Sequence, residues 1–196
     1  EMAMRAENAY RSTLYELVAV TETMDDNLAK LRVSAGAGEQ RMLLTEILVE
    51  TSLMESALEK IPVDAATSTD ISAFVNRTNH FARRMLAKLA AGDPLSEREK
   101  AAAAQLYEIN AALAHELNDL AVNTPADELR AFFEGEAGNV QSRFREWGSS
   151  AQEKREEISD APFAGEGNVE ENGVEKAPEV SVKDAEQKVR AFFEGY

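Results

Sequence analysis

The chain of 196 residues contains no cysteine, only five prolines and only ten glycines. The absence of cysteine excludes disulfides, zinc–thiolate sites and thiol catalysis, although it leaves the cellular compartment open. Because proline and glycine are scarce, helices are favoured over sheets. The sequence also lacks any run of about eighteen apolar residues, the length that a membrane span requires. Since the chain begins with Glu1 and Met2, an upstream signal or anchor outside it stays open.

Basic residues are also fewer than acidic ones. There are 21 Lys and Arg against 36 Asp and Glu, which gives a net charge of −15. This balance argues against nucleic acid as a partner, because no basic stripe is present to displace counterions from phosphates. It also argues against adhesion to an anionic lipid surface through this region. With 44% hydrophobic and 29% charged residues, the chain has the composition of a soluble globular protein.

A long apolar heptad pattern lies near the start of the chain. Over residues 10–31 the pattern has alternating spacings of 4 and 3, at Tyr10, Leu14, Leu17, Thr21, Met24, Leu28 and Leu31. Such an a/d seam, with charged residues on the remaining surface, predicts a helix from about residue 3 to 33. A single helix of this kind is marginally stable in water, so it requires other helices as partners.

Three further segments carry similar seams: residues 39–61, 70–91 and 96–121. In the last segment Glu116 occupies the strict heptad position, so the register shifts at Leu117. The expected fold class is therefore all-α, an antiparallel up-down-up-down bundle of four long helices. We expect eight residues to share one core: Leu14, Leu17, Leu44, Ile47, Phe74, Phe81, Leu106 and Leu113.

Local signals predict where some of these helices begin. Residues 63–69 have the composition of a polar connector, with Thr69 or Asp70 as the N-cap of the third helix. Ser96 and Glu99 form a Ser-x-x-Glu capping box at the start of the fourth helix.

A fifth helix is predicted after Thr124 and Pro125, with a kink or break near 135–138 where glycines weaken it. Its apolar side consists of Leu129, Phe133, Val140, Phe144 and Trp147. Residues 156–180 are predicted to be an acidic, mobile linker, and residues 181–196 a short amphipathic helix that begins a truncated domain. The bundle domain itself is then expected to span residues 1–155.

Motifs for catalysis or metal binding are missing. Neither His80 nor His115 has the glutamate three residues earlier that a di-iron bundle needs, and Asp119 replaces the second histidine of a zincin motif. No glycine-rich phosphate loop or Gly-x-Ser-x-Gly elbow is present. We therefore expect no cofactor, no metal and no enzymatic activity. The rival hypothesis of a carboxylate-based hydrolase is the third of the three function classes considered.

One polar cluster stands out on the third helix, formed by Asn76, Asn79 and His80. Inside a bundle these residues could hold a small ligand, as in an extracytoplasmic sensor domain with a pocket of a few hundred Å³. The alternative is a hydrogen-bonded or surface cluster with no ligand.

Several short motifs occur in the order found in a known family. They are Ala9-Tyr10-Arg11, Tyr15-Glu16-Leu17, Leu44-Thr45-Glu46-Ile47, Leu58 to Pro62, Phe74-Val75-Asn76, Gly92 to Glu97, Leu106-Tyr107, Asp160 to Phe163, and Ser181 to Gly195. The chain resembles the N-terminal helical region of the YpeB family of spore-germination proteins, followed by the first helix of a PepSY repeat. Ala161 departs from the family's Asp-Gly-Pro-Phe motif, which leaves a role for Asp160, Pro162 and Phe163 as an interaction motif open.

The resemblance implies a function as well as a fold. It implies an upstream membrane anchor, PepSY repeats downstream, and a position on the outer face of the spore inner membrane, with the present stretch itself soluble. The implied partner is a SleB-like cortex-lytic enzyme, which the domain would support and restrain through protein contacts or as a membrane-proximal spacer. The alternative from the residues is a ligand-sensing helical bundle.

Overall fold

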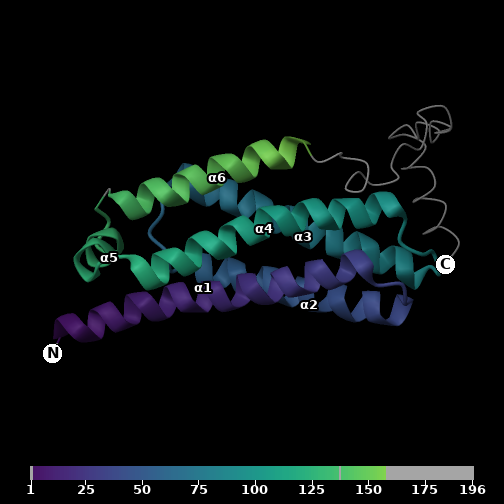
Figure 1. Ribbon diagram of the computed structural model, residues 1–196, viewed down its shortest axis with the longest axis horizontal. Helices are drawn as coiled ribbons and strands as arrows, with labels where there is room; N and C mark the ends of the chain where they lie inside the picture. Colours follow the sequence, from purple (N-terminus) through teal and green to yellow (C-terminus); the bar gives the residue numbers. More distant parts are fainter. Residues whose placement is uncertain (1, 137, 158–196) are drawn as a thin grey trace, which may run out of the picture. The chain divides into compact units, whose positions relative to one another are not determined.

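The computed structural model describes residues 2–136 and 138–157, which form helices and loops without any strand (Figure 1). The helices are α1 (Met2–Val33), α2 (Ala37–Leu58), α3 (Ala65–Ala90), α4 (Glu97–Asn123), α5 (Ala126–Phe133) and α6 (Asn139–Glu157). The predicted all-α fold with four long helices is confirmed. None of these helices combines the length and the apolar character that crossing a bilayer demands.

The predicted core is confirmed residue by residue. The eight side chains expected to meet are each at most 2% exposed, and all belong to one hydrophobic cluster. Every apolar member of the α1 seam from Leu14 to Leu31 is fully buried, and Tyr10 packs against the edge of the cluster. Because the heptad spacing puts these side chains on one side of each helix, burial follows directly from the sequence pattern.

The helices pack around this core in a closed circuit. α1 contacts α2 and α4, α2 contacts α3, and α6 contacts both α3 and α4 (Figure 1). The second half of the predicted fifth helix is therefore an integral wall of the bundle, since α6 inserts Val140, Phe144 and Trp147 into the shared core.

The break predicted near residues 135–138 is also found. α5 ends at Phe133, and Gly135 has a φ of 87°, the left-handed conformation that commonly ends a helix at glycine. The amide nitrogen of Glu136 donates to the carbonyl oxygen of Ala131 at 2.9 Å, so the last turn is closed before the chain leads into α6. Phe132 is buried, while Phe133 is only partly buried and stacks on Tyr10 with ring centroids 4.5 Å apart.

The predicted start of α3 is wrong. The helix begins at Ala65, and its N-cap is Asp64, whose carboxylate accepts a hydrogen bond from the backbone nitrogen of Thr67 at 2.9 Å. Neither Thr69 nor Asp70 is the cap, and most of the supposed connector 63–69 is helical. The cap is a local contact across three residues, and the same carboxylate also accepts hydrogen bonds from Gln141 and Arg145 of α6.

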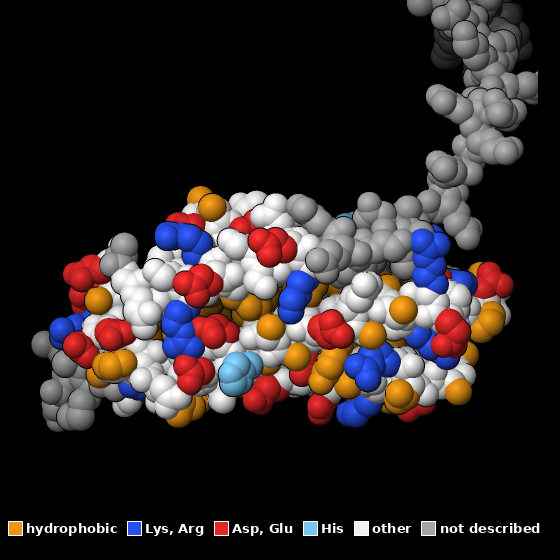
Figure 2. Space-filling view, turned by 45° about the horizontal axis from the view of Figure 1, so that its top comes forward, with side chains coloured by type: hydrophobic (Ala, Val, Ile, Leu, Met, Phe, Trp, Pro, Cys, Tyr) orange, Lys and Arg blue, Asp and Glu red, His pale blue; other side chains and the backbone are white. Residues whose placement is uncertain are grey.

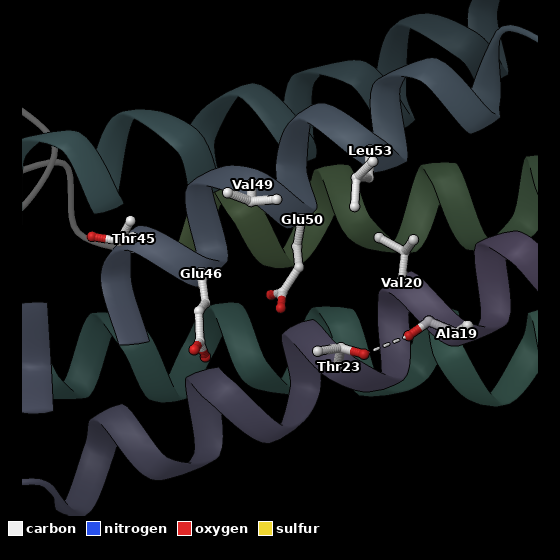
Figure 3. Close-up of a pocket in the computed structure, with 8 residues that line it drawn as sticks. All are labelled: Ala19, Val20, Thr23, Thr45, Glu46, Val49, Glu50 and Leu53. Atoms are coloured by element: carbon white, nitrogen blue, oxygen red, sulfur yellow. Dashed lines mark hydrogen bonds between the residues drawn. The ribbon is translucent and has the colours of Figure 1, made fainter. Parts of the chain in front are cut away.

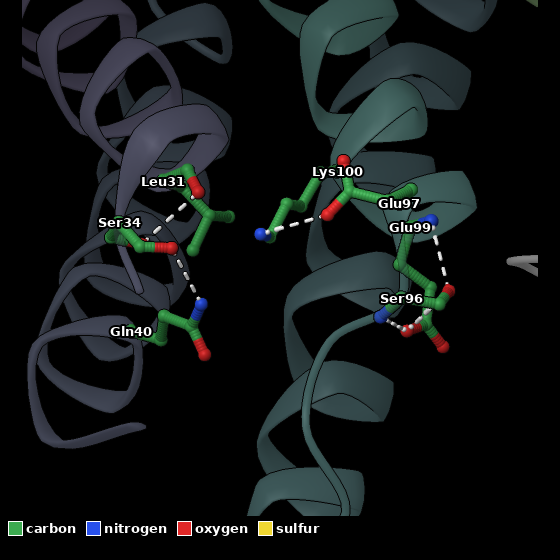
Figure 4. A network of polar contacts seen from close by, with 7 residues as sticks. All are labelled: Leu31, Ser34, Gln40, Ser96, Glu97, Glu99 and Lys100. Atoms are coloured by element: carbon green, nitrogen blue, oxygen red, sulfur yellow. Dashed lines mark hydrogen bonds and ion pairs between the residues drawn. The ribbon is translucent and has the colours of Figure 1, made fainter. Parts of the chain in front are cut away.

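The capping box at the start of α4 is confirmed (Figure 4). The Ser96 hydroxyl accepts from the Glu99 backbone nitrogen at 3.3 Å, and Glu99 Oε2 accepts from the Ser96 backbone nitrogen at 2.7 Å. Lys88 of α3 donates to both oxygens of Glu99, at 2.9 and 2.8 Å, so the cap also ties two helices together.

The register shift in α4 has a structural cause. Leu113 and Leu117 are both buried, whereas Glu116 faces α6 and forms an ion pair with Arg143. Arg143 also donates to Asp119 at 2.6 Å. Glu116, at the strict heptad position, therefore contacts a basic residue of α6 and does not enter the core.

α6 continues to Glu157, two residues past the predicted end of the bundle at residue 155. The remainder of the predicted linker, residues 158–180, and the predicted helix 181–196 lie outside the described residues. On the face shown in Figure 2, acidic and basic side chains are interspersed with hydrophobic ones over the described surface.

Candidate functional site

A groove of about 330 Å³ lies between α1 and α2 (Figure 3). The residues lining it are Ala19, Val20, Thr23, Thr45, Glu46, Val49, Glu50 and Leu53. The walls are aliphatic for the most part, and the two carboxylates both come from α2. A groove of this size accommodates one or two side chains or a small ligand.

The sequence of both helices explains why the groove is open. On α1 the small residues Ala19 and Thr23 are one turn apart, so no bulky side chain fills the space beside α2. On α2 the outward side carries Met42, Val49 and Leu53, which are 56%, 55% and 52% exposed. Thr45 and Glu46 lie on this side as well, so the outward side of α2 mixes exposed apolar residues with polar ones, whereas its buried seam is turned away from it.

Glu50 is the unusual residue of the groove. It is 6% exposed, and one carboxylate oxygen, Oε1, accepts a hydrogen bond from Asn27 of α1 at 2.8 Å. The other oxygen, Oε2, is buried without a hydrogen-bond partner among the described residues. In Figure 3 the side chain extends from α2 toward α1. A buried acceptor left unpaired costs about 1–3 kcal/mol, more when it is charged.

The surroundings of Glu50 raise its pKa to about 7 from the ordinary 4.5. Burial is the main cause, because it disfavours the charged form. The hydrogen bond from Asn27 and the charge of Lys30 act in the opposite direction, and the nearby carboxylate of Glu46 raises the pKa further. Near neutral pH the groove therefore holds a carboxyl group that is poised between its neutral and charged forms.

Similar polar contacts cross two other helix interfaces of the bundle. Asn79 of α3 donates to Thr51 of α2 at 2.8 Å. Asn110 of α4 donates to the Thr21 carbonyl oxygen at 2.8 Å and to Asp25 at 3.1 Å, both on α1. Burial raises the pKa of Asp25 despite this hydrogen bond. These hydrogen bonds join neighbouring helices at buried or partly buried positions, and the Oδ1 atom of Asn110 has no partner among the described residues.

The three residues of the predicted polar cluster do not converge. Asn79 lies at the interface with α2 and also accepts a hydrogen bond from Arg83 at 2.7 Å, whereas Asn76 and His80 are exposed. The role of this cluster in holding a ligand stays a prediction. The predicted interaction motif of Asp160, Pro162 and Phe163 lies outside the described residues.

Sequence reasoning missed Glu50 and its partner Asn27. Both sit one position from a seam residue, next to Thr51 and Leu28, where a heptad predicts the boundary between core and solvent. The only signal was a polar residue beside the seam on each of two facing helices. In residues 2–136 and 138–157 no three His, Asp or Glu side chains gather as a metal site.

The groove combines a buried carboxylate with aliphatic side chains. Glu50 supplies one free acceptor, Glu46 adds negative charge at the rim, and the aliphatic residues offer contact to methylene groups. A nucleophile paired with a base is not among the lining residues.

Comparison with known proteins bears on the whole domain. A family model described as YpeB N-terminal matches residues 1–132, which include α1 to α4 and most of α5. Searches among curated proteins and among solved structures gave no match. The matched region covers 132 of the 196 residues and contains the resembling motifs from Ala9 to Tyr107, whereas those at Asp160 to Phe163 and Ser181 to Gly195 lie beyond it. The chain therefore belongs to the YpeB N-terminal family, a family of domains from spore germination proteins.

Proposed function

We propose that this domain is a non-enzymatic support that holds and restrains a cortex-lytic enzyme of the SleB type at the outer face of the spore inner membrane. The observation that carries the proposal is a closed bundle with polar contacts across its interfaces, in a chain that belongs to the YpeB N-terminal family. Such a body is suited to present a surface or to set a distance.

Direct contact and spacing make different demands on the surface. A spacer needs only rigidity. A contact domain needs a complementary patch, and for a chain of net charge −15 the complementary partner surface is basic. The open groove with its free carboxylate oxygen favours contact over a purely passive spacer.

The test is isothermal titration calorimetry, in which the chain is titrated into the purified lytic enzyme at low and at physiological salt. We expect binding that weakens as salt rises, because screening reduces attraction between opposite charges. Absence of binding at both salts, with binding restored by a longer chain that includes the PepSY repeats, would leave the bundle as a spacer. Absence of binding with the repeats present would contradict the proposal itself.

The predicted alternative, a small-molecule sensor, has weaker support. It requires several polar groups that converge on one pocket. The groove holds a single unpaired carboxylate oxygen, and the Asn76, Asn79 and His80 cluster does not contribute to it.

A further inference from the structure

The free acceptor of Glu50 defines what the groove can take. Oε2 is buried and unpaired, so a donor that enters between α1 and α2 would satisfy it without displacing the hydrogen bond from Asn27. A cationic donor gains most, because hydrogen bonds to charged groups are the strong ones. A neutral or anionic donor would meet Glu46 and Glu50 without compensating their charge.

The apolar walls define the rest of the occupant. Val20 of α1 and Val49 and Leu53 of α2 line the groove, so a cation on an aliphatic stem would pack its methylene groups against them. Lysine and arginine have this form, because their methylene groups pack on apolar surface while the charged end reaches a polar partner.

The length of the apolar stripe distinguishes a helix from a free amine. Met42, Val49 and Leu53 follow one another at intervals of 7 and 4 residues on α2. The distance from the first to the last is about 16 Å along the helix axis. A small amine in the groove would reach Val49 and Leu53 but not Met42, which does not line the groove. A helix laid along α1 and α2 would contact the whole length of the stripe through side chains at i, i+4 and i+7.

We propose that the groove between α1 and α2 docks a basic amphipathic helix of a partner protein, one Lys or Arg of which inserts toward Glu50 Oε2. The inference rests on the proposed function only in taking the partner to be a protein. It names a specific surface of the domain and the chemistry of the segment that this surface recognises.

The experiment selects binders from a displayed library of helical 16-residue peptides with one randomised face, using the full chain as target. We expect the selected peptides to share a Lys or Arg with apolar residues three or four positions away. Affinities of the purified peptides are then measured by calorimetry. Selected peptides without a basic residue would overturn the proposal.

Two variants of the chain locate the binding. Glu50→Gln keeps the shape and removes the charge, and should weaken binding about ten- to a hundredfold. Leu53→Ser, at an exposed position that leaves the core intact, should weaken it about tenfold. Glu97→Gln and Val122→Ser are the matched controls on α4, which contributes no residue to the groove, and should change binding by less than about twofold.

A double-mutant cycle tests the specific pair. Replacing the selected lysine by norleucine keeps the aliphatic stem and removes the ammonium group. This replacement should cost as much as Glu50→Gln, and the two losses should not add when combined. Equal binding of the peptides to the chain and to its Glu50→Gln variant would contradict insertion toward Oε2.

The pH dependence provides an independent measurement. The groups that face Glu50 are Glu46 on α2 and Lys30 on α1, and Lys30 lies 4.0 Å from Asp26. Because Glu50 must lose its proton to pair with a cation, binding should weaken about tenfold between pH 8 and pH 6. Glu50→Gln should abolish this dependence. A pH profile shared by the chain and the variant would contradict the proposal.

Failure of this proposal and failure of the proposed function are distinguishable. If the lytic enzyme binds the chain, the Glu50→Gln variant and the Leu53→Ser variant equally, the groove assignment is wrong and the supporting function stands. If the peptides bind as described but the enzyme does not, the groove assignment stands alone. Self-association in sedimentation that Leu53→Ser abolishes would assign the groove to a second copy of the chain and overturn the proposal.

Discussion

At the scale of single residues, the buried seam contributes to stability because its apolar side chains are removed from water. Leu17 is fully buried in the centre of the α1 seam. Leu17→Ala removes its contacts and leaves a cavity, so the free energy of unfolding should fall by about 2–5 kcal/mol. Denaturant unfolding followed by circular dichroism measures the change.

Met42→Ala is the control for this substitution, because Met42 lies on the exposed side of α2. Its effect should stay within about 0.5 kcal/mol. Equal decreases in the free energy of unfolding would show that the buried and exposed sides of the helices have been assigned wrongly.

Glu50 should make stability depend on pH. Its folded-state pKa of about 7 exceeds the ordinary 4.5, so the folded protein holds the proton more tightly than the unfolded chain. This contribution is fully present below pH 4.5 and is lost as the pH rises to about 7. The free energy of unfolding of the Glu50→Gln variant, relative to that of the unsubstituted chain, should therefore rise by up to about 3 kcal/mol between pH 4.5 and pH 8.

Urea unfolding of the chain and the variant across this pH range measures the difference. Subtraction removes the pH dependence that the other carboxylates contribute to both proteins. A constant difference across the range would show that Glu50 titrates at an ordinary pKa.

At the scale of elements, the ends of helices are held by side chains that also join neighbouring helices. Arg11 of α1 donates to the carbonyl oxygens of Ala121 and Thr124 at 2.7 and 2.9 Å, at the end of α4. Arg41 of α2 donates to the carbonyl oxygen of Leu89 near the end of α3. Cationic groups at helix C-termini satisfy free carbonyls and complement the helix dipole.

The capping box of α4 provides a test at this scale. Ser96→Ala removes the acceptor for the Glu99 backbone nitrogen, and should lower the free energy of unfolding by about 0.5–2 kcal/mol. Ser12→Ala, at an exposed position in the interior of α1, is the control and should have little effect. Thermal unfolding compares the variants, and an unchanged midpoint for Ser96→Ala would show that the cap contributes nothing to stability.

At the scale of the whole molecule, the bundle extends beyond the region that the family model matches. The match ends at residue 132, yet α6 closes the circuit between α3 and α4. At Gly148 α6 approaches α3 so closely that an added Cβ would lie 3.3 Å from the Cβ of Asp70. The side chains of Gln141 and Arg145 donate to Asp64 at 2.7 and 2.8 Å, which joins α6 to the N-cap of α3.

Truncation should therefore show that the folding unit is longer than the region that the family model matches. A chain that ends at Phe133 loses Val140, Phe144, Trp147 and Ala151 from the core. Each large side chain contributes about 1.5–3 kcal/mol by burial, so the loss is comparable to the whole stability of a typical domain. We expect this chain to lose cooperative unfolding and to bind a hydrophobic dye.

A chain that ends at Glu157 keeps every core residue in the described part of the molecule, and should unfold at the same denaturant midpoint as the full chain. Cooperative unfolding of the chain that ends at Phe133, with an unchanged midpoint, would show that α6 is not part of the folding unit.

Local patterns in the sequence were sufficient to predict much of this fold. The α1 seam, the capping box at Ser96 and the break near Gly135 depend on residues within one or two helical turns of each other. Hydrophobic spacing, side-chain acceptors at a helix start and the left-handed conformation of glycine act over that range, so no knowledge of distant contacts was needed.

The position of α6 and the groove were decided only by tertiary structure, whereas the cap at the start of α3 is a local contact between Asp64 and Thr67 to which tertiary contacts are added. Asp64 is reinforced as a cap by residues 77 and 81 positions away in the sequence. Glu50 acquires its raised pKa mainly because the packing of the bundle buries it. The periodicity of α2 predicted its buried seam, but it could not show that Val49 and Leu53 would line a groove beside α1, because that depends on the partner that the helix meets.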